Sequence, residues 1–514
     1  MADARAELSA GNAINHHQQA MPIKRLKIPL VIFGLAILIG LGVLGFITII
    51  VLSLNRLYLA NAPSNIIVDQ YNAYPAVLYV WSGQDRSVSN AADFVAVVDF
   101  DETSTSYGHI LKYVPLVSDS SKSIGQAGNG PHHSSVSSDG KYFITGGLLS
   151  FLLKQKEVFV WGVPSNPANG PEFLYALDVP GGCPGEFLPI GRAKFIVSMM
   201  CSESAVSPGD MTFIDASTGV FQSLSKGKSA FQNFNPRGFG RVESGSNSTA
   251  DYIEALSLTG TDAPKISFRN TVRYILPDGS LARAFNFDAP IEVSTTSGVG
   301  QGIGFMELKK IPNDPLDRSF AHGNNTNKLY LLGPGISEPK LVYDLSQVSG
   351  HKKAFGAGIT SIFLNGKRLL MAFQMRYIIL LDITKPETPS ILRTFDFCSD
   401  KSLKNELLQV SSSNQTITFR QFCAQNKNKA GSHVLVHPKG ESRFIVINYF
   451  LKVGFAQFNG TRTVHAFKLN KKLTNFEYAS RFNPNFQFDS PSAPVRSTLY
   501  SLKAYPHHSQ YIKL

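Results

Sequence analysis

Residues 130–147 read Gly-Pro-His-His-Ser-Ser-Val-Ser-Ser-Asp-Gly-Lys-Tyr-Phe-Ile-Thr-Gly-Gly and combine a histidine pair, a turn and a strand. The turn Ser138-Asp139-Gly140-Lys141 predicts a hairpin, because Gly tolerates positive φ and Asp hydrogen-bonds its own backbone. The apolar run 142–145 that follows predicts a strand. Turn and strand recur along the chain, whereas the pair His132-His133 does not recur with them. We interpret the repeat as the signature of the fold and the histidines as the position of its site.

The recurring unit is a polar or glycine turn, a basic residue and a short apolar run, and a second strand follows each copy. Residues 271–287 read as a further hairpin around Asp278-Gly279. Paired strands without intervening amphipathic helices favour an all-β propeller, in which radial packing buries both faces of each small sheet. The spacing fits about seven blades and leaves six or eight open. The copies cover residues 139–145, 191–199, 325–332, 366–373 and 439–448, and their second strands cover residues 158–163, 211–215, 340–344, 377–382 and 463–469.

Composition supports a folded, strand-rich protein. Of the 514 residues, 43% are hydrophobic and 17% are charged, which excludes wholesale disorder. The 36 Phe and 42 Gly suit strands and turns better than helices. The net charge of +12 comes from scattered Lys and Arg side chains, which indicates a solvated surface and no nucleic-acid partner.

An uncharged stretch near the N-terminus predicts a membrane anchor. Residues 28–54, from Ile28 to Leu54, carry no charge, which is long enough to span a bilayer and too long for the apolar core of a signal peptide. More positive charges precede this stretch than follow it, so we expect a cytoplasmic N-terminus and a lumenal or extracellular propeller, with membrane lipid as a partner. The expected parts are a cytoplasmic tail (1–27), a signal anchor (28–54), a linker with the start of the ectodomain (55–90) and the propeller (91–514).

Cysteines and glycosylation sequons agree with this topology, because all of them follow the anchor. The four cysteines are expected to pair as Cys183–Cys201 and Cys398–Cys423 outside the cytosol. An alternative use of Cys183 as a metal ligand stays open, and a disulfide would exclude it. The sequons start at Asn247, Asn324, Asn414 and Asn459.

Several stretches, in the same order along the chain, resemble the selenium-binding protein/methanethiol oxidase family. The resemblance spans residue 93 to the C-terminus. It rests on Asp93-Phe94-Val95-Ala96-Val97-Val98-Asp99-Phe100-Asp101, Pro131-His132-His133-Ser134, Ser207-Pro208-Gly209-Asp210, Gly302-Ile303-Gly304 with Glu307-Leu308-Lys309, Asp382-Ile383-Thr384-Lys385-Pro386-Glu387-Thr388-Pro389, Gln457-Phe458 and Asn483-Pro484-Asn485-Phe486.

The resemblance implies a seven-bladed propeller with a histidine metal site near its axis, and copper-dependent oxidation of methanethiol in active members. His132 and His133 match the family's histidine pair. Cys183-Pro184-Gly185-Glu186 stands where the family has His-x-x-His, and Pro312 stands where it has a further histidine. The family's C-terminal histidine falls within residues 498–501, which contain none, and the loop 135–139 lacks the family's cysteine.

The candidate metal ligands are therefore a mixed set, suited to copper or another transition metal. They are His132, His133, Cys183, Glu186, His507 and His508. His507-His508 belongs to the C-terminal segment that, by the resemblance, approaches the site. Three other histidines could supply a compensating ligand or be ordinary strand or surface residues: His322, His433 and His437.

Two functions follow from these observations. The first is a membrane-anchored propeller that serves as a binding or interaction module for a small thiol or selenium ligand or for a protein, motivated by the replaced ligands. The second is a metal-dependent, methanethiol oxidase-like enzyme with a rebuilt site, motivated by His132 and His133. No Gly-x-Ser-x-Gly or His-Glu-x-x-His motif supports a hydrolase or metalloprotease, and no converging Asp, Asn and Glu set supports a calcium-dependent lactonase.

Overall fold

The computed structural model describes much of the chain beyond residue 74, all of it within the second of two compact units, Val68–Leu514. Within these residues, no helix combines the length and the apolar character that a membrane span requires. The expected tail, the anchor 28–54 and all four sequon asparagines lie outside the described residues. The described residues are 75–84, 92–118, 124–125, 128–204, 208–225, 228, 234–242, 252–257, 259–262, 265–268, 271–276, 278–286, 305–323, 327–333, 336, 338–349, 357–363, 366–373, 376–410, 415–425, 432–448, 451–453, 456–458, 464–484, 486 and 504–513.

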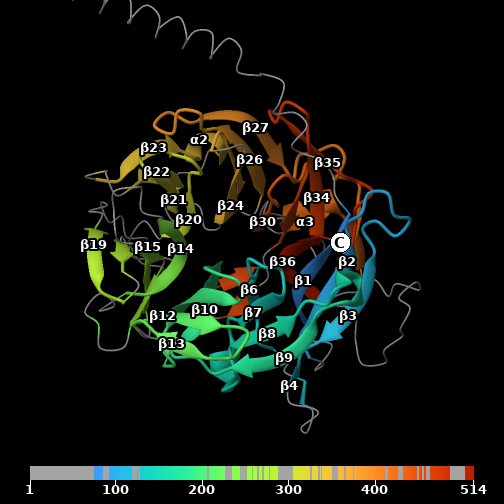
Figure 1. The fold of residues 1–514 in the computed structure, drawn as a ribbon. Helices are drawn as coiled ribbons and strands as arrows, with labels where there is room; N and C mark the ends of the chain where they lie inside the picture. Colours follow the sequence, from blue (N-terminus) through green and yellow to red (C-terminus); the bar gives the residue numbers. More distant parts are fainter. Residues whose placement is uncertain are drawn as a thin grey trace, which may run out of the picture. The chain divides into compact units, whose positions relative to one another are not determined.

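The described strands form seven four-stranded antiparallel sheets, here numbered sheets 1 to 7. Each is given from its first strand, which lies nearest the centre in Figure 1, to its last. They are sheet 1, β36 (Ala504–Lys513), β1 (Ala76–Gln84), β2 (Phe94–Asp99), β3 (Ile110–Pro115); sheet 2, β6 (Pro131–Val136), β7 (Tyr142–Gly147), β8 (Val158–Gly162), β9 (Glu172–Leu177); sheet 3, β10 (Gly182–Pro189), β11 (Lys194–Cys201), β12 (Asp210–Asp215), β13 (Phe221–Ser223); sheet 4, β14 (Pro236–Val242), β15 (Tyr252–Ser257), β18 (Thr271–Ile275), β19 (Leu281–Asn286); sheet 5, β20 (Phe305–Lys310), β21 (Ser319–Gly323), β22 (Lys328–Leu332), β23 (Lys340–Asp344); sheet 6, β24 (Ala357–Phe363), β25 (Arg368–Phe373), β26 (Tyr377–Asp382), β27 (Ser390–Asp396); and sheet 7, β30 (Val434–Val436), β31 (Arg443–Ile447), β34 (Val464–Leu469), β35 (Phe476–Tyr478).

Shorter elements join or extend these sheets. They are the strand pairs β4 (Val117–Ser118) with β5 (Ile124–Gly125), β16 (Thr259–Asp262) with β17 (Lys265–Phe268), β28 (Leu407–Val410) with β29 (Gln415–Thr418) and β32 (Leu451–Val453) with β33 (Ala456–Phe458), and the helices η2 (Ser150–Leu153), η3 (Pro167–Asn169), α2 (Ser346–Ser349) and α3 (Phe419–Gln425).

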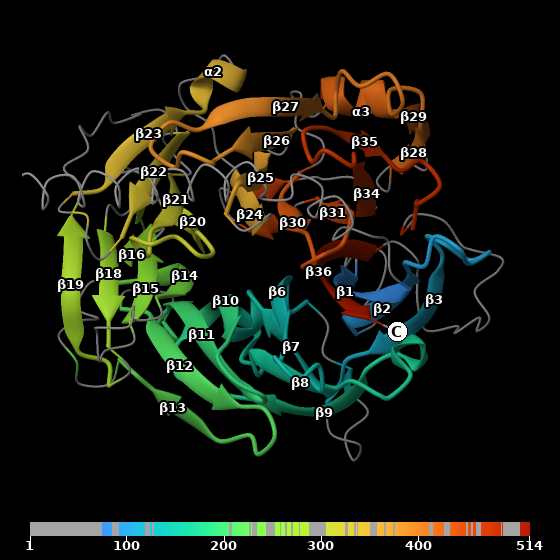
Figure 2. The same cartoon turned by 45° about the horizontal axis from the view of Figure 1, so that its top comes forward.

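The sheets close into a ring, so the expected all-β propeller is confirmed. The first strand of each sheet contacts the first strand of the next, in the order β36, β6, β10, β14, β20, β24, β30 and back to β36. Sheet 1 combines strands from the beginning and the end of the propeller's sequence, because β36 pairs antiparallel with β1 along its whole length. Figures 1 and 2 show this red C-terminal strand beside the blue strands β1 and β2.

The core lies between the sheets. In the part of the chain that the structure describes, the buried apolar side chains form seven clusters, and each cluster combines residues from two neighbouring sheets. Seven sheets in an open row would have only six interfaces between neighbours. The seventh interface joins sheet 7 to sheet 1 and closes the ring. There, Val434 and Ile445 pack with Leu78 and Val98. The two neighbours of each blade thus cover its two faces, which a single sheet could not bury alone.

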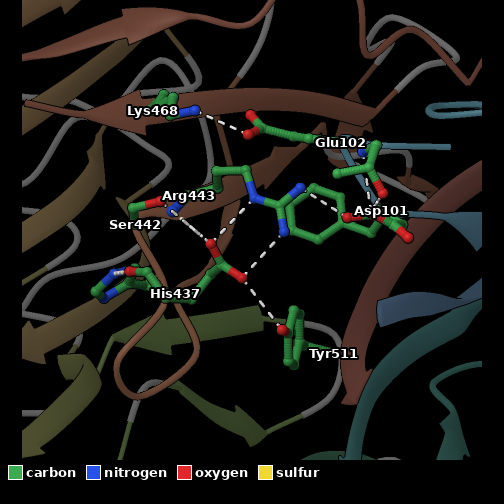
Figure 3. Close-up of polar contacts among 10 residues, drawn as sticks. Asp101, Glu102, His437, Ser442, Arg443, Lys468 and Tyr511 are labelled. Atoms are coloured by element: carbon green, nitrogen blue, oxygen red, sulfur yellow. Dashed lines mark hydrogen bonds and ion pairs between the residues drawn. The ribbon is translucent and has the colours of Figure 1, made fainter. Parts of the chain in front are cut away.

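A buried ion pair reinforces the closure between sheets 7 and 1 (Figure 3). The Arg443 guanidinium, on β31, donates to both oxygens of Glu441 at 3.0 Å and to the backbone oxygen of Phe100, next to β2, at 2.6 Å. Tyr511, on β36, donates its hydroxyl proton to Glu441 Oε2 at 3.1 Å. The Arg443 side chain is fully buried, so these contacts satisfy a charge that burial would otherwise penalise heavily.

The expected repeat corresponds to particular strands. In sheets 2, 3, 6 and 7 the unit and its partner form the second and third strands, and in sheet 5 they form the third and fourth. The first strands, which face the axis, were not among the expected copies. The propeller also starts before residue 91, where we placed its boundary, because β1 lies within 55–90 and belongs to sheet 1.

Candidate functional site

Both histidine pairs lie on first strands, at positions where the strand pairing is irregular. In β6 the register with β7 shifts between Pro131 and Ser134, which brackets His132 and His133. In β36 the register with β1 shifts beside His508. Successive residues of a regular strand point to opposite faces, and a bulge re-aims them. The local irregularity therefore allows both members of each pair to lie in one region.

Five buried imidazoles meet where β6, β36 and the start of β30 converge. The ring centroids of His132 and His133 lie 4.3 Å apart, and that of His132 lies 5.1 Å from His507. The rings of His133 and His508 stack at 5.0 Å, and His433 contacts His507 at 5.7 Å. All five are at most 6% exposed. The structure thus brings together His132, His133, His507 and His508, four of the expected ligand residues, with His433. The two pairs lie near opposite ends of the propeller's sequence.

Hydrogen bonds orient two of these rings. His132 Nδ1 donates to the Pro184 carbonyl oxygen at 2.9 Å, so its proton is on Nδ1 in the neutral form. Ser134 Oγ hydrogen-bonds His508 Nδ1 at 2.7 Å, and Gln510 donates from Nε2 to the Ser134 carbonyl oxygen at 2.8 Å. Sheets 1, 2 and 3 are thereby connected through the cluster.

A cavity of about 360 Å³ lies beside the cluster. The first strands β6, β10, β20, β30 and β36 contribute its walls, so it is an axial cavity of the propeller. His133 and His508 line it together with polar groups on three strands: Ser135, Glu186 and Lys309. Apolar side chains, among them Phe187 and Leu435, complete the lining. Most of the lining side chains are polar, and they converge from several strands beside an apolar part of the wall. Convergent polar groups in a concave site are typical of a binding site for a small molecule.

Lys309 places a positive charge between two carboxylates at this wall. Its Nζ lies 3.1 Å from Glu186 Oε1 on β10 and 3.9 Å from Glu307 Oε2 on β20. The backbone N–H of Glu186 donates to Ser198 Oγ at 2.7 Å, which fixes the strand at this point. The cavity thus presents both a cation and an anion to a bound molecule.

The expected disulfides are confirmed: Cys183 bonds to Cys201, and Cys398 bonds to Cys423. The alternative use of Cys183 as a thiolate ligand is therefore wrong for this structure. Among the described residues, no group of three or more His, Cys, Asp or Glu side chains is arranged to hold a metal ion. Glu186 shares the cavity with His133 and His508 but pairs with Lys309. We therefore correct the expected metal site to a histidine-lined cavity.

The two other candidate histidines of the sequence analysis are His322 and His437. His322 is buried, its ring edge contacts Phe373, and burial lowers its pKa to about 3. His437 Nε2 donates to the Glu441 carbonyl oxygen at 2.8 Å, and burial lowers its pKa to about 4. Both imidazoles are neutral at physiological pH. His437 also lines the axial cavity, whereas His433 reaches the histidine cluster through its contact with His507.

Sequence reasoning missed the roles of Ser134 and Gln510, which orient the cluster, and of Lys309. A usable signal was present. Pro131, Pro184 and Pro236 each stand in the first strand of a sheet, and in each strand the register shifts directly after the proline. Proline in a sheet is confined to strand starts, edges and bulges, so its recurrence indicates the irregular first strands.

The fold and its axial cavity define the chain as a β-propeller. No protein-family model and no curated protein matches the sequence. Among solved structures, a hypothetical selenium-binding protein from Sulfolobus tokodaii is similar, with a TM-score of 0.60 and 12% identity over 86% of this chain and 97% of that one. The expected resemblance is thereby confirmed as a distant likeness of fold.

Two propellers described as lactonases are also similar in fold. A putative 6-phosphogluconolactonase from Bacteroides fragilis has a TM-score of 0.46 and 10% identity over 86% of this chain and 98% of that one. A periplasmic gluconolactonase from Pseudomonas aeruginosa has a TM-score of 0.49 and 8% identity over 85% and 99%.

Proposed function

We propose that the protein is a membrane-anchored, extracytoplasmic propeller of seven blades that binds a small molecule in its axial cavity. The observation that carries the proposal is the cavity itself: five first strands, from sheets remote in sequence, converge on one concave space. Binding sites of this kind are mostly apolar with a few convergent polar groups. The lining shares the convergence of polar groups, since His133, Glu186 and Lys309 meet beside Phe187, but it is more polar than most such sites.

The chemistry of the wall limits the ligand class. An anionic group of a ligand can replace Glu186 as the partner of Lys309, and a cationic group can replace Lys309 as the partner of Glu186. The seryl hydroxyls and imidazoles can donate or accept. We therefore expect a compact molecule with one polar end and a short apolar body. A small thiol or selenol also fits, since imidazole and apolar surfaces tolerate sulfur.

Two features support the extracytoplasmic location. The uncharged residues 28–54 precede the propeller, and both disulfides lie within it. Disulfides persist in oxidising compartments and are rare in the cytosol. Treatment of the chain from a eukaryotic host with a glycosidase tests the topology: the apparent mass should fall, and it should not change when Asn247, Asn324, Asn414 and Asn459 are replaced by Gln. An unglycosylated wild-type chain would contradict the orientation.

Binding is tested with three small probes: butyrate, butylammonium and methanethiol. Saturation-transfer NMR on the full chain in nanodiscs should detect at least one of them. Ser135→Trp, which fills the cavity, should abolish the signal. Ser217→Trp is the matched control, because Ser217 is exposed on the turn after β12, and it should bind as the wild type does. Absence of all three signals, or signals that persist in Ser135→Trp, would contradict an axial site.

A further inference from the structure

The Cys183–Cys201 disulfide lies directly beside the axial histidines. It joins the first strand of sheet 3 to the second, and Pro184, the residue after Cys183, gives its carbonyl oxygen to His132 Nδ1 at 2.9 Å. The register of β10 shifts between Pro184 and Phe187, and Glu186 within that irregular segment lines the cavity. The disulfide is therefore one residue away from a contact that orients the cluster.

Cys183 has an unfavourable backbone conformation. Its φ of 58° lies in the left-handed region, which non-glycine residues seldom adopt. Such a conformation is strained and persists only where the surrounding structure imposes it. Neither Cys398 nor Cys423 has a positive φ. Both disulfides join one half-buried to one buried cysteine, so exposure does not distinguish them, whereas the backbone conformation of Cys183 does.

We propose that Cys183–Cys201 is a reducible clamp that controls the axial cavity. A thiolate from a small thiol attacks Sγ of the half-buried Cys183, the S–S bond breaks, and Cys201 leaves as a thiolate that takes up a proton. A second thiol attacks the mixed disulfide and releases Cys183. Two thiols are oxidised to one disulfide, and the protein disulfide is reduced by the same two electrons.

Reduction removes what holds Cys183 at positive φ, so its backbone returns to the favoured region and the Pro184 carbonyl moves with it. His132 then loses its acceptor, and Glu186 and Phe187 shift in the cavity wall. The proposal rests on the proposed function for its consequence on binding. Loss of one orienting hydrogen bond corresponds to about a three- to tenfold weaker affinity.

A built-in reporter allows the displacement to be measured without any ligand. Trp81 donates from Nε1 to the Gly146 carbonyl oxygen at 2.9 Å. Gly146 packs closely on the clamp segment, since a Cβ there would lie 2.8 Å from Phe187 Cζ and 3.0 Å from Pro184 Cγ. Movement of Pro184 should therefore change the fluorescence of Trp81, one of only two tryptophans in the chain.

The test is a redox titration of the full chain in nanodiscs with a dithiol, followed by differential alkylation and mass spectrometry. Cys183–Cys201 should be reduced at a less reducing potential than Cys398–Cys423, and the tryptophan emission should change at the first step. Reduction of both at one potential, or of Cys398–Cys423 first, overturns the clamp. The double variant Cys183→Ser/Cys201→Ser should reproduce the emission change without reductant, and Cys398→Ser/Cys423→Ser should not.

Binding of butyrate and butylammonium, which cannot reduce a disulfide, to the oxidised chain and to Cys183→Ser/Cys201→Ser then separates the two proposals. Weaker binding to the variant supports control of the cavity by the clamp. Equal binding to both overturns that control and leaves the proposed function standing. No binding to either contradicts the proposed function and with it the control of binding, while the order of reduction remains a separate result.

Discussion

Replacement of Arg443 by Met should destabilise the closed ring severely. The substitution keeps much of the side chain's volume but removes the guanidinium, leaving the Glu441 carboxylate 1% exposed and without its partner. Breaking a buried pair by removing one member typically costs about 3–5 kcal/mol. The contact of the guanidinium with the Phe100 ring, at 4.0 Å from the centroid, is lost as well. We therefore expect a loss of about 4 kcal/mol in the free energy of unfolding.

The same region contains a matched control (Figure 3). Lys468 Nζ lies 2.8 Å from Glu102 Oε2, and the Lys468 side chain is 52% exposed. Exposed pairs contribute about 0–1 kcal/mol, because water screens them, so Lys468→Met should lose well under 1 kcal/mol. Replacing both Arg443 and Glu441 by apolar residues should recover most of the loss, because no unpaired charge then remains buried.

The assay is urea unfolding of the full chain, followed by tryptophan fluorescence and by circular dichroism. Trp81 and Trp161 lie in sheets 1 and 2, close to the closure, and comparison with circular dichroism shows whether the transitions coincide. Equal losses for Arg443→Met and Lys468→Met would refute the buried-pair reasoning. So would a double variant that is less stable than Arg443→Met.

Three further predictions concern buried groups around the first sheets. Burial, with Asp178 and Glu203 nearby, raises the pKa of Glu157 to about 8, so the stability of the fold should fall as the pH rises from about 4.5 to 8. Glu157→Gln should therefore raise the free energy of unfolding at pH 7 by about 2–3 kcal/mol and have little effect near pH 4. Thermal unfolding at the two pH values measures the difference. Burial raises the pKa of Asp93 to about 6 despite three hydrogen bonds from Gln84 and Asn129. The stability of the wild type should therefore decline as the pH rises from about 4 to 6. An Asp93→Asn variant that retains this decline would contradict its origin in Asp93. Gly146→Ala should cost about 1–3 kcal/mol because its Cβ would overlap Phe187, whereas Gly191→Ala, with its nearest neighbour at 3.7 Å, should be nearly neutral in the same unfolding assay.

The sequence reveals strands whose apolar residues pack between sheets. The second and third strands of most sheets are runs such as Phe143 to Thr145 or Ile378 to Leu381, buried on both faces. Their hydrophobicity alone marks them, and the turns beside them carry Gly and Asp. The first strands face the axis instead, and several are interrupted by proline, glycine or polar residues, as in Pro131–Val136 and Gly182–Pro189, so these lack the apolar pattern that identifies a strand.

The site depends on contacts that no local pattern encodes. Trp81 is paired with His508 across β1 and β36, a register set by closure of the whole ring. The resemblance directed attention to His132 and His133, and the disulfide pairing followed from the cysteines. The mutual contact of the two histidine pairs required the topology, and the replacement of a metal site by a cavity with the Lys309–Glu186 pair required side-chain geometry.

The most direct measurement is a crystal structure of the full chain with the tightest of the three probes bound. Binding in the axial cavity predicts electron density for the probe between β6, β10, β20 and β36, with its polar end at Lys309 or Glu186 and its body against Phe187. Density only on the outer surface, or an axial cavity that stays empty at probe concentrations that saturate the NMR signal, would contradict the proposed function.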